Sequence, residues 1–113
     1  MHEVGIAENV LRIVERTATE HGLATVRRVE LSIGRLSGVD AEALEFAFSV
    51  IAPGTVLEGA EIQIEVPPIL LRCRPCGSSY EAAMEETACP RCGAFDFEIT
   101  QGRDMTVTSV SGE

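Results

Sequence analysis

The chain contains no tryptophan, and aromatic residues make up only 4% of its 113 positions. Any core must therefore be aliphatic, and the 45% share of hydrophobic residues is enough for a modest one. With that share, intrinsic disorder is not expected. The length suits one ordinary domain or two very small ones.

Long apolar runs and an excess of positive charge are also missing. No run approaches the roughly 18 apolar residues that a membrane span requires. The first residues, Met1-His2-Glu3-Val4, lack the basic and apolar regions of a secretory signal, so we expect a cytoplasmic protein. Nine basic residues against 18 acidic ones give a formal charge of −9, which argues against binding to nucleic acid backbones.

Hydrophobic periodicity predicts both helices and strands. Apolar residues at three- and four-residue steps predict a helix over 3–21, and a second helix that begins after Asp40 and ends before Pro53. Asp40 is suited to cap the second helix. Alternation of apolar and polar residues predicts strands over 25–34, 60–66 and 105–108.

A cysteine-bearing segment interrupts this pattern. Pro67-Pro68 ends the strand over 60–66, and the short strand over 105–108 needs an earlier sheet to join. The sequence therefore predicts an α+β fold, with two helices packed on a small three-stranded mixed sheet and an inserted zinc-ribbon module. The predicted domains are residues 1–68 plus 101–113, which form an α/β domain, and residues 69–100, which form the zinc ribbon.

Two Cys-x2-Cys-Gly knuckles are the most specific motif in the chain, and 12 residues separate them. Two residues between thiolates let one tight turn present both sulfurs to a metal, and the following glycine tolerates the positive φ of that turn. Two such turns complete a tetrahedral site, which we expect to hold one structural zinc ion per chain. The predicted zinc ligands are Cys73, Cys76, Cys89 and Cys92. A closed site of this kind does not catalyse a reaction.

Two other interpretations of these cysteines remain open. A pair of disulfides is possible in principle, although a reducing cytoplasm disfavours it. Iron in a rubredoxin-like site is the second, because iron and zinc share the four-sulfur tetrahedron. The few aromatic residues of the segment favour zinc, since they would shield a redox iron poorly.

The N-terminus offers a second metal site of a different kind. The α-amine of Met1 and the amide nitrogen of His2 can close a five-membered chelate ring, and that amide with His2 Nδ1 can close a six-membered ring. A planar set of nitrogens suits Ni(II) or Cu(II). Glu3 can add an oxygen from its side chain or backbone. Because the nitrogens must be deprotonated, binding should weaken as the pH falls.

The combination of these features resembles the HypA/HybF family of hydrogenase nickel-incorporation proteins. The similarity includes the Met-His-Glu start, the turn from Gly34 to Gly38 before the helical segment Ala43 to Phe48, and both knuckles. It covers essentially the whole chain. In two respects the chain departs from the family: Val4-Gly5-Ile6 replaces the commoner Leu-Ser-Ile or Leu-Ser-Leu, and no histidine flanks a knuckle. The pH sensing attributed to such histidines in some relatives is therefore not expected here.

The resemblance implies a nickel metallochaperone, which is not an enzyme. It implies nickel ligands at Met1, His2 and Glu3, with Asp40 as a weaker candidate, and zinc at the four cysteines. Nickel would be a transient cargo, passed with a HypB-type GTPase to the large subunit of [NiFe]-hydrogenase, and in some members to urease. We expect a monomer or a weak homodimer.

Two rival functions are less consistent with the sequence. The first is a zinc-ribbon module that binds nucleic acid or protein, but residues 69–100 carry three arginines against five acidic residues, which disfavours nucleic acid. The second is an enzyme, either a redox protein with iron at the cysteines or a hydrolase. The sequence has no Ser/His/Asp arrangement, phosphate-binding glycine loop or open metal site to support catalysis.

Overall fold

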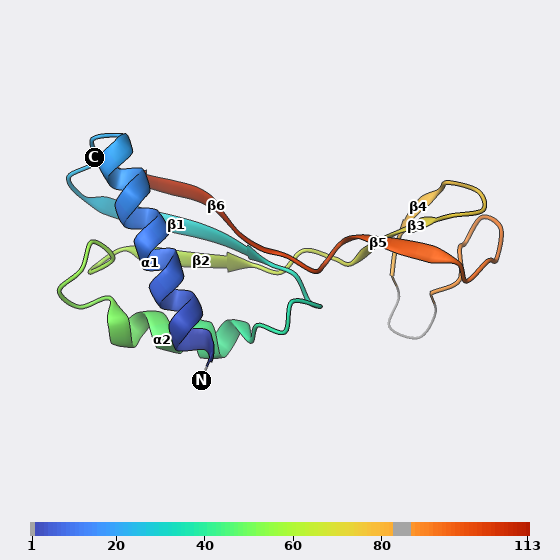
Figure 1. Cartoon of the computed structure of the whole chain (residues 1–113), viewed down its shortest axis with the longest axis horizontal. Helices are drawn as coiled ribbons and strands as arrows, with labels where there is room; N and C mark the ends of the chain where they lie inside the picture. Colours follow the sequence, from blue (N-terminus) through green and yellow to red (C-terminus); the bar gives the residue numbers. More distant parts are fainter. Residues whose placement is uncertain (1, 83–86) are drawn as a thin grey trace.

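The computed structural model describes residues 2–82 and 87–113 and contains two helices and two small sheets (Figure 1). In chain order the elements are α1 (His2–Glu20), β1 (Val26–Ile33), α2 (Ala41–Ile51), β2 (Glu61–Glu65), β3 (Leu70–Cys73), β4 (Ser79–Glu81), β5 (Phe97–Gln101) and β6 (Met105–Gly112). The predicted α+β fold is confirmed, with each predicted element within a few residues of its expected place. In the part of the chain that is described, neither helix has the length and apolarity to cross a membrane.

The first sheet has the strand order β2-β1-β6 and is mixed. Strand β1 runs parallel to β2, with Val29 beside Ile62, and antiparallel to β6, with Val29 beside Val110. The C-terminal strand thus returns to the sheet formed by the earlier strands, as predicted. It is longer than predicted, since it pairs along β1 from Ile33 back to Val26.

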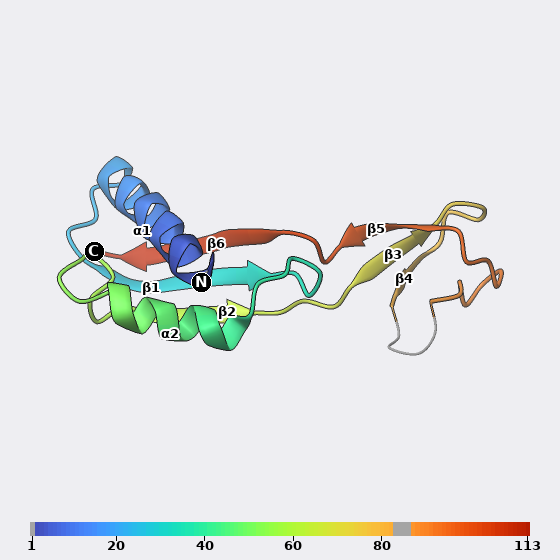
Figure 2. The same ribbon diagram turned by 60° about the horizontal axis from the view of Figure 1, so that its bottom comes forward.

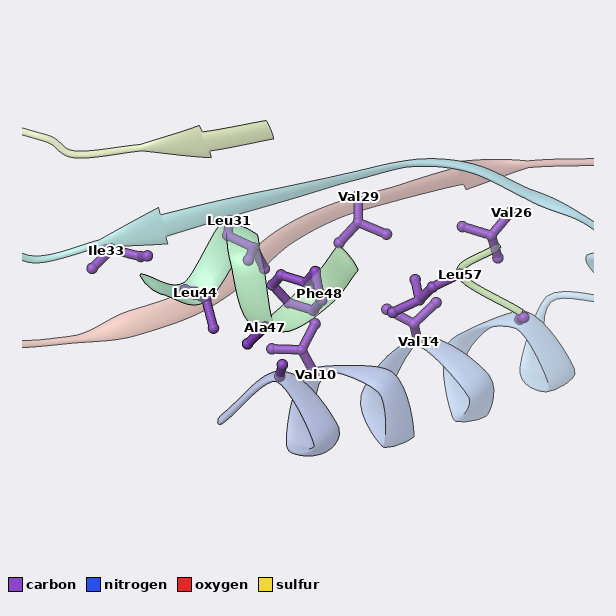
Figure 3. Close-up of a cluster of buried hydrophobic side chains, with 12 residues drawn as sticks. Val10, Val14, Val26, Val29, Leu31, Ile33, Leu44, Ala47, Phe48 and Leu57 are labelled. Carbon is purple, nitrogen blue, oxygen red and sulfur yellow. The ribbon is translucent and has the colours of Figure 1, made fainter. Parts of the chain in front are cut away.

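Both helices cover one face of this sheet and enclose an aliphatic core (Figure 3). Val10 and Val14 of α1 meet Leu44 and Phe48 of α2 over the inward side chains of β1 (Figure 3). Phe48 is the one aromatic residue in the buried cluster, which agrees with the low aromatic content. The cluster as described is Ala7, Val10, Val14, Ala18, Val26, Val29, Leu31, Ile33, Leu44, Ala47, Phe48 and Leu57.

Local sequence signals fix where the helices begin and end. Helix α1 ends in a Schellman motif: Gly22 adopts φ 67°, and the Leu23 N–H donates to the Ala18 carbonyl at 2.8 Å. At the start of α2 the Asp40 carboxylate accepts the backbone N–H groups of Glu42 and Ala43, at 3.0 and 3.2 Å. Asp40 is therefore the N-cap of α2, as its position predicts.

The second sheet contains the cysteine-bearing segment and has the antiparallel order β4-β3-β5. Strands β3 and β5 lie beside the two knuckles. Strand β4 was not predicted, because its three residues are too few to show a periodicity. Leu71 at the centre of β3 is buried between Tyr80 of β4 and Ile99 of β5 in the register.

The chain crosses twice between the two sheets, after β2 and before β6, and the molecule is elongated, with extents of 53 × 29 × 17 Å (Figure 2). At the crossing the backbones of Gly34 and Gly102 touch. The Leu36 N–H donates to the Gly102 carbonyl at 2.8 Å, and the Gly34 N–H donates to the Asp104 carbonyl at 2.8 Å. A Cβ at Gly34 would lie 2.2 Å from the Gly102 oxygen, so glycine is required there.

Candidate metal centres

The two knuckles adopt the same backbone conformation. In the first, the Gly77 N–H donates to the Cys73 carbonyl at 2.8 Å, and in the second the Gly93 N–H donates to the Cys89 carbonyl at 2.8 Å. Each glycine has φ 76°, a value that side chains rarely tolerate. The glycine after each cysteine pair is therefore part of the turn that aims two sulfurs in one direction.

The knuckles face each other and bring all four sulfurs together, as their spacing predicts. One ligand atom from each of Cys73, Cys76, Cys89 and Cys92 lies within 4.8 Å of the other three. Across the knuckles, Cys73 Sγ lies 3.5 Å from Cys92 Sγ, and Cys76 Sγ lies 3.6 Å from Cys89 Sγ. A disulfide requires about 2.0 Å between sulfurs. The four thiols are free, so the disulfide interpretation is not the observed arrangement.

Sulfurs about 2.3 Å from a tetrahedral zinc ion lie about 3.8 Å from one another. The separations of 3.5 and 3.6 Å are close to that value. Cys73 and Cys89 are buried while Cys76 and Cys92 are exposed, so the site lies at the surface of the module with one side protected. The donor set therefore fits a tetrahedral metal ion. Zinc and iron share this preference for four sulfurs in a tetrahedron.

The thiols of the cluster differ in their pKa values. The hydrogen bond between Cys76 Sγ and Ser78 Oγ, 3.3 Å apart, lowers the pKa of Cys76 to about 6. The backbone N–H of Cys76 favours a thiolate at Cys73, but burial and the other three sulfurs outweigh it and raise the pKa of Cys73 to about 12. Burial and the hydrogen bonds among the sulfurs therefore disfavour a thiolate at Cys73. A bound divalent ion would favour the thiolate form of its ligands.

Two ion pairs link β3 and the first knuckle to β5 and the residue before it. Arg74, inside the first knuckle, contacts Asp96 at 2.7 Å, and its backbone N–H donates to the Asp96 carbonyl at 3.0 Å. Arg72 of β3 contacts Glu98 of β5. These arginines are engaged with acidic neighbours within the module. Surface pairs of this kind contribute little energy each, so they orient the knuckle more than they stabilise it.

The N-terminal candidate site is partly visible. Met1 lies outside the described residues, and helix α1 begins at His2, one residue earlier than predicted. His2 Nε2 lies 3.0 Å from Glu3 Oε2. The His2 side chain is 65% exposed, whereas the Glu3 side chain is 9% exposed. Nδ1, the nitrogen that the predicted chelate uses, is on the other side of the ring from this contact.

The burial of Glu3 was not anticipated. Glu3 falls on the same stripe of α1 as Ala7, Val10 and Val14, all of which are buried. That helical spacing is a signal that the sequence contains, and it places the carboxylate at the end of the core. Burying a carboxylate without a partner is costly. The contact with His2 therefore stabilises the buried Glu3 carboxylate, whether or not the pair binds a metal.

Asp40 stands apart from the other predicted nickel ligands. Among the described residues, the four cysteines are the only group of three or more potential ligands close enough to hold one ion, so Asp40 does not form such a group with His2 and Glu3. One oxygen of its carboxylate, Oδ1, accepts both N–H groups of the α2 cap. A nickel-binding role for Asp40 stays a prediction.

Comparison with known proteins identifies the family. A family model described as hydrogenase/urease nickel incorporation, metallochaperone, hypA, matches residues 1–112. The chain belongs to the HypA family. The family predicted from the N-terminal residues and the knuckles is therefore confirmed.

Curated HypA proteins match along their whole length. Hydrogenase maturation factor HypA of Chlorobaculum tepidum is 39% identical over 113 residues, with all of both chains covered. The factor of the same name from Desulfitobacterium hafniense is 38% identical and is covered over 99% of its length. The solution structure of the Ni metallochaperone HypA from Helicobacter pylori is 24% identical, with a TM-score of 0.71 over 99% of this chain and 97% of that one. This last match shows that the HypA fold is shared.

Proposed function

We propose that this chain is a nickel metallochaperone that binds Ni(II) at its N-terminus and delivers it during hydrogenase maturation. Its membership in a family of nickel-incorporation metallochaperones is the observation that carries the proposal. In this role the protein is a carrier and not an enzyme, working in the cytoplasm. Nickel is a cargo that must be bound selectively and then released.

The proposed nickel ligands are Met1, His2 and Glu3. The first N–H groups of a helix have no partner within it, so the His2 amide is free to lose its proton and coordinate a metal. Metal-binding histidines commonly donate their second ring N–H to a carboxylate, which fixes the ring. The contact of His2 Nε2 with Glu3 supports this role, because it leaves Nδ1 for the metal. Asp40 is retained as a secondary candidate.

The proposed zinc site is structural and consists of Cys73, Cys76, Cys89 and Cys92, with one ion per chain. When bound, zinc would cross-link the two knuckles. The equal turn geometry of the knuckles and the sulfur separations support this assignment. We propose the same domain division as the sequence suggests, with residues 1–68 and 101–113 presenting nickel and residues 69–100 forming the zinc ribbon.

The proposed partners follow from the family resemblance. A HypB-type GTPase would assist delivery, and the large subunit of [NiFe]-hydrogenase would receive the nickel, with urease as a second recipient in some organisms. Two relatives carry the name hydrogenase maturation factor, which supports hydrogenase as the recipient. A site with few side chains at the end of the chain can release its metal by one protonation or by exchange with a competing thiolate.

Nickel titration of three variants and the wild type tests the N-terminal site. We expect His2→Ala to bind Ni(II) at least about tenfold more weakly, because it removes the imidazole nitrogen from the chelate. A variant with one residue added before Met1 places a second amide between the α-amine and His2 Nδ1, so we expect its Ni(II) affinity to differ from that of the wild type. His21→Ala is the matched control, since His21 is an exposed histidine in the turn after α1. Equal nickel affinity in all four proteins would refute N-terminal binding.

Mass spectrometry of the native protein tests the stoichiometry. We expect one zinc ion per chain before nickel is added, and one additional, exchangeable nickel ion afterwards. Loss of zinc alone when any of the four cysteines is replaced would support the ligand assignment. A chain purified with iron in place of zinc would contradict the identity of the structural metal.

A further inference from the structure

Strand β2 is an edge strand, and it lies beside α2 (Figures 1 and 2). Within the described chain β2 pairs with β1 only, so the backbone groups on its outer side have no strand partner. An edge of this kind is a template for an additional strand. The edge also has apolar side chains, because Ile62 and Ile64 lie half-buried along it.

A pocket of about 300 Å³ lies between this edge and α2. Phe48 and Ala52 line it from the α2 side, Leu57 from the connecting loop, and Ile62 from β2. Glu45 and Ser49 of α2 also line it, together with Gly59 and Ala60, and none of the lining residues is basic. A groove between an edge strand and a helix, with a partly apolar pocket in it, is the arrangement by which some domains bind an extended peptide as an added strand.

The open face of the same edge is acidic. The register places Glu61 beside Arg28, Gln63 beside Glu30, and Glu65 beside Ser32, all on the side of the sheet away from the helices. Arg28 contacts Glu30 at 3.0 Å and Glu61 at 3.4 Å, so one guanidinium serves two carboxylates. Together with Glu65, three carboxylates meet one basic group on this face. An added strand would lie next to uncompensated negative charge.

This charge pattern argues against pairing with a second copy of the chain. Antiparallel pairing of two β2 strands about Gln63 would place Glu61 of each copy opposite Glu65 of the other. Like charges directly opposite each other destabilise a strand pair. The occupant of the edge should instead alternate basic residues, on the open face, with apolar residues, on the helix side.

We propose that the groove between β2 and α2 binds an extended segment of a partner protein with alternating basic and apolar residues. The segment pairs with the outer edge of β2. One of its apolar side chains enters the pocket at Phe48 and Ile62, and its basic side chains face Glu61 and Glu65. This proposal does not depend on nickel binding, because the groove contains none of the proposed metal ligands.

Peptide titration followed by amide NMR tests the proposal on the full-length, zinc-loaded protein. The probe is acetyl-Arg-Leu-Arg-Val-Arg-amide, and acetyl-Glu-Leu-Glu-Val-Glu-amide is its charge-reversed control. We expect the arginine peptide to shift the amides of residues 61–65 and of the pocket, and to slow hydrogen exchange in β2. The glutamate peptide should bind at least about tenfold more weakly.

Two variants at adjacent exposed positions of α2 separate the groove from the rest of the helix. Ser49→Trp should block the pocket and weaken arginine-peptide binding at least about tenfold. Val50→Trp places the same side chain one residue further on, at a position that is 60% exposed and outside the pocket lining, and should leave binding unchanged. Far-UV circular dichroism checks that both fold. Glu65→Lys should also weaken binding, and it leaves α2 untouched.

Several results would overturn the proposal. Equal affinity for the two peptides would show that charge does not determine binding. Amide shifts located away from β2 would show that the peptide binds elsewhere. Unchanged binding by Ser49→Trp would exclude the pocket. Sedimentation showing a dimer that Glu65→Lys strengthens would assign the edge to a second copy of this chain, because the new lysine would lie opposite Glu61 of the other copy. Nickel affinity is measured on the same variants, and its preservation keeps this outcome separate from that of the proposed metallochaperone function.

Discussion

The two sheets of this protein are held together in different ways. The sheet of β2, β1 and β6 lies under two helices, and the buried hydrophobic cluster belongs to this part of the chain. In the sheet of β4, β3 and β5, the buried hydrophobic positions among described residues are Leu71, Cys73 and Cys89. Two of these three are proposed zinc ligands. One region therefore depends on apolar burial, and the other has too little of it to fold without a cross-link.

Under the proposed domain division, the difference would explain how one short chain contains two stable units. Burial of apolar area stabilises by about 25 cal/mol per Å², so it needs layers of side chains that a three-stranded ribbon lacks. Bound zinc acts at a single point and needs only four thiolates correctly placed. We therefore expect the two regions to respond independently to changes in core packing and in metal binding.

Replacing one thiolate should have the largest effect. Cys73→Ser leaves three sulfurs at the proposed zinc site, and zinc binding contributes on the order of 10 kcal/mol to the folding of small zinc modules. We expect amides of β3 and β5 to lose their hydrogen-exchange protection while amides of β1 keep theirs. Chelation of the metal from the wild type should reproduce this result. If the amides of β3 kept full hydrogen-exchange protection without metal, the two regions would not differ in their dependence on metal.

Truncating a core side chain should destabilise the α/β region and leave the cysteine-bearing region unchanged. Leu44 is 0% exposed, and Leu44→Ala should lower the free energy of unfolding of the α/β region by about 3 kcal/mol, measured by urea denaturation. Zinc content should not change. Val50→Ala, on the exposed side of α2, serves as the control and should change stability by less than about 0.5 kcal/mol. Release of zinc by Leu44→Ala would show that the regions are coupled.

A substitution at the crossing between the sheets should affect both regions. In Gly34→Ala the new methyl group meets the Gly102 backbone, and we expect a loss of about 2 kcal/mol with weaker protection of the Leu36 and Gly34 amides. Gly5→Ala is the control, and we expect it to change stability in the opposite direction. Nothing lies within 4 Å of a Cβ at Gly5, so this helix substitution should stabilise by about 0.5–1 kcal/mol. Stabilisation by both substitutions would be inconsistent with the close approach at Gly34.

The smallest effect is expected at the cap of α2. Asp40→Ala should cost about 1 kcal/mol, because the Glu42 and Ala43 N–H groups lose their acceptor. Asp40→Asn retains a capping oxygen without the charge and should be nearly neutral. Thermal unfolding measures both. If Asp40→Asn keeps its stability but binds Ni(II) more weakly, the carboxylate is a nickel ligand in addition to a cap.

Much of the fold was predictable because its signals are local. The stripe of α1 and the alternation of β1 follow from a period of 3.6 or 2 in apolar residues, and Gly22 and Asp40 mark helix ends by their own conformational preferences. The convergence of the four cysteines was also predictable, since each knuckle is a tight turn with a fixed geometry. Nothing in these features requires knowledge of distant residues.

Other features depend on tertiary contacts. Strand β4 is three residues long and exists because β3 offers it an edge, and β6 extends to Gly112 because β1 is long enough to pair with it. The burial of Glu3 depends on what packs over the start of α1. Its spacing from Ala7 and Val10 indicates the buried side of the helix, but the contact with His2 could only be seen in the structure.

By itself the sequence determined that this is an acidic chain with an aliphatic α/β part, two cysteine knuckles, and the residues that mark the HypA family. These properties lie in composition, periodicity and short spacings, each of which acts over a few neighbouring residues. Only the tertiary structure decided which strand is left at the edge, that α2 leaves a pocket beside it, and that the acidic residues of β2 face the same side as Glu30. Those properties depend on how strands far apart in the sequence are ordered and registered, which no local pattern specifies.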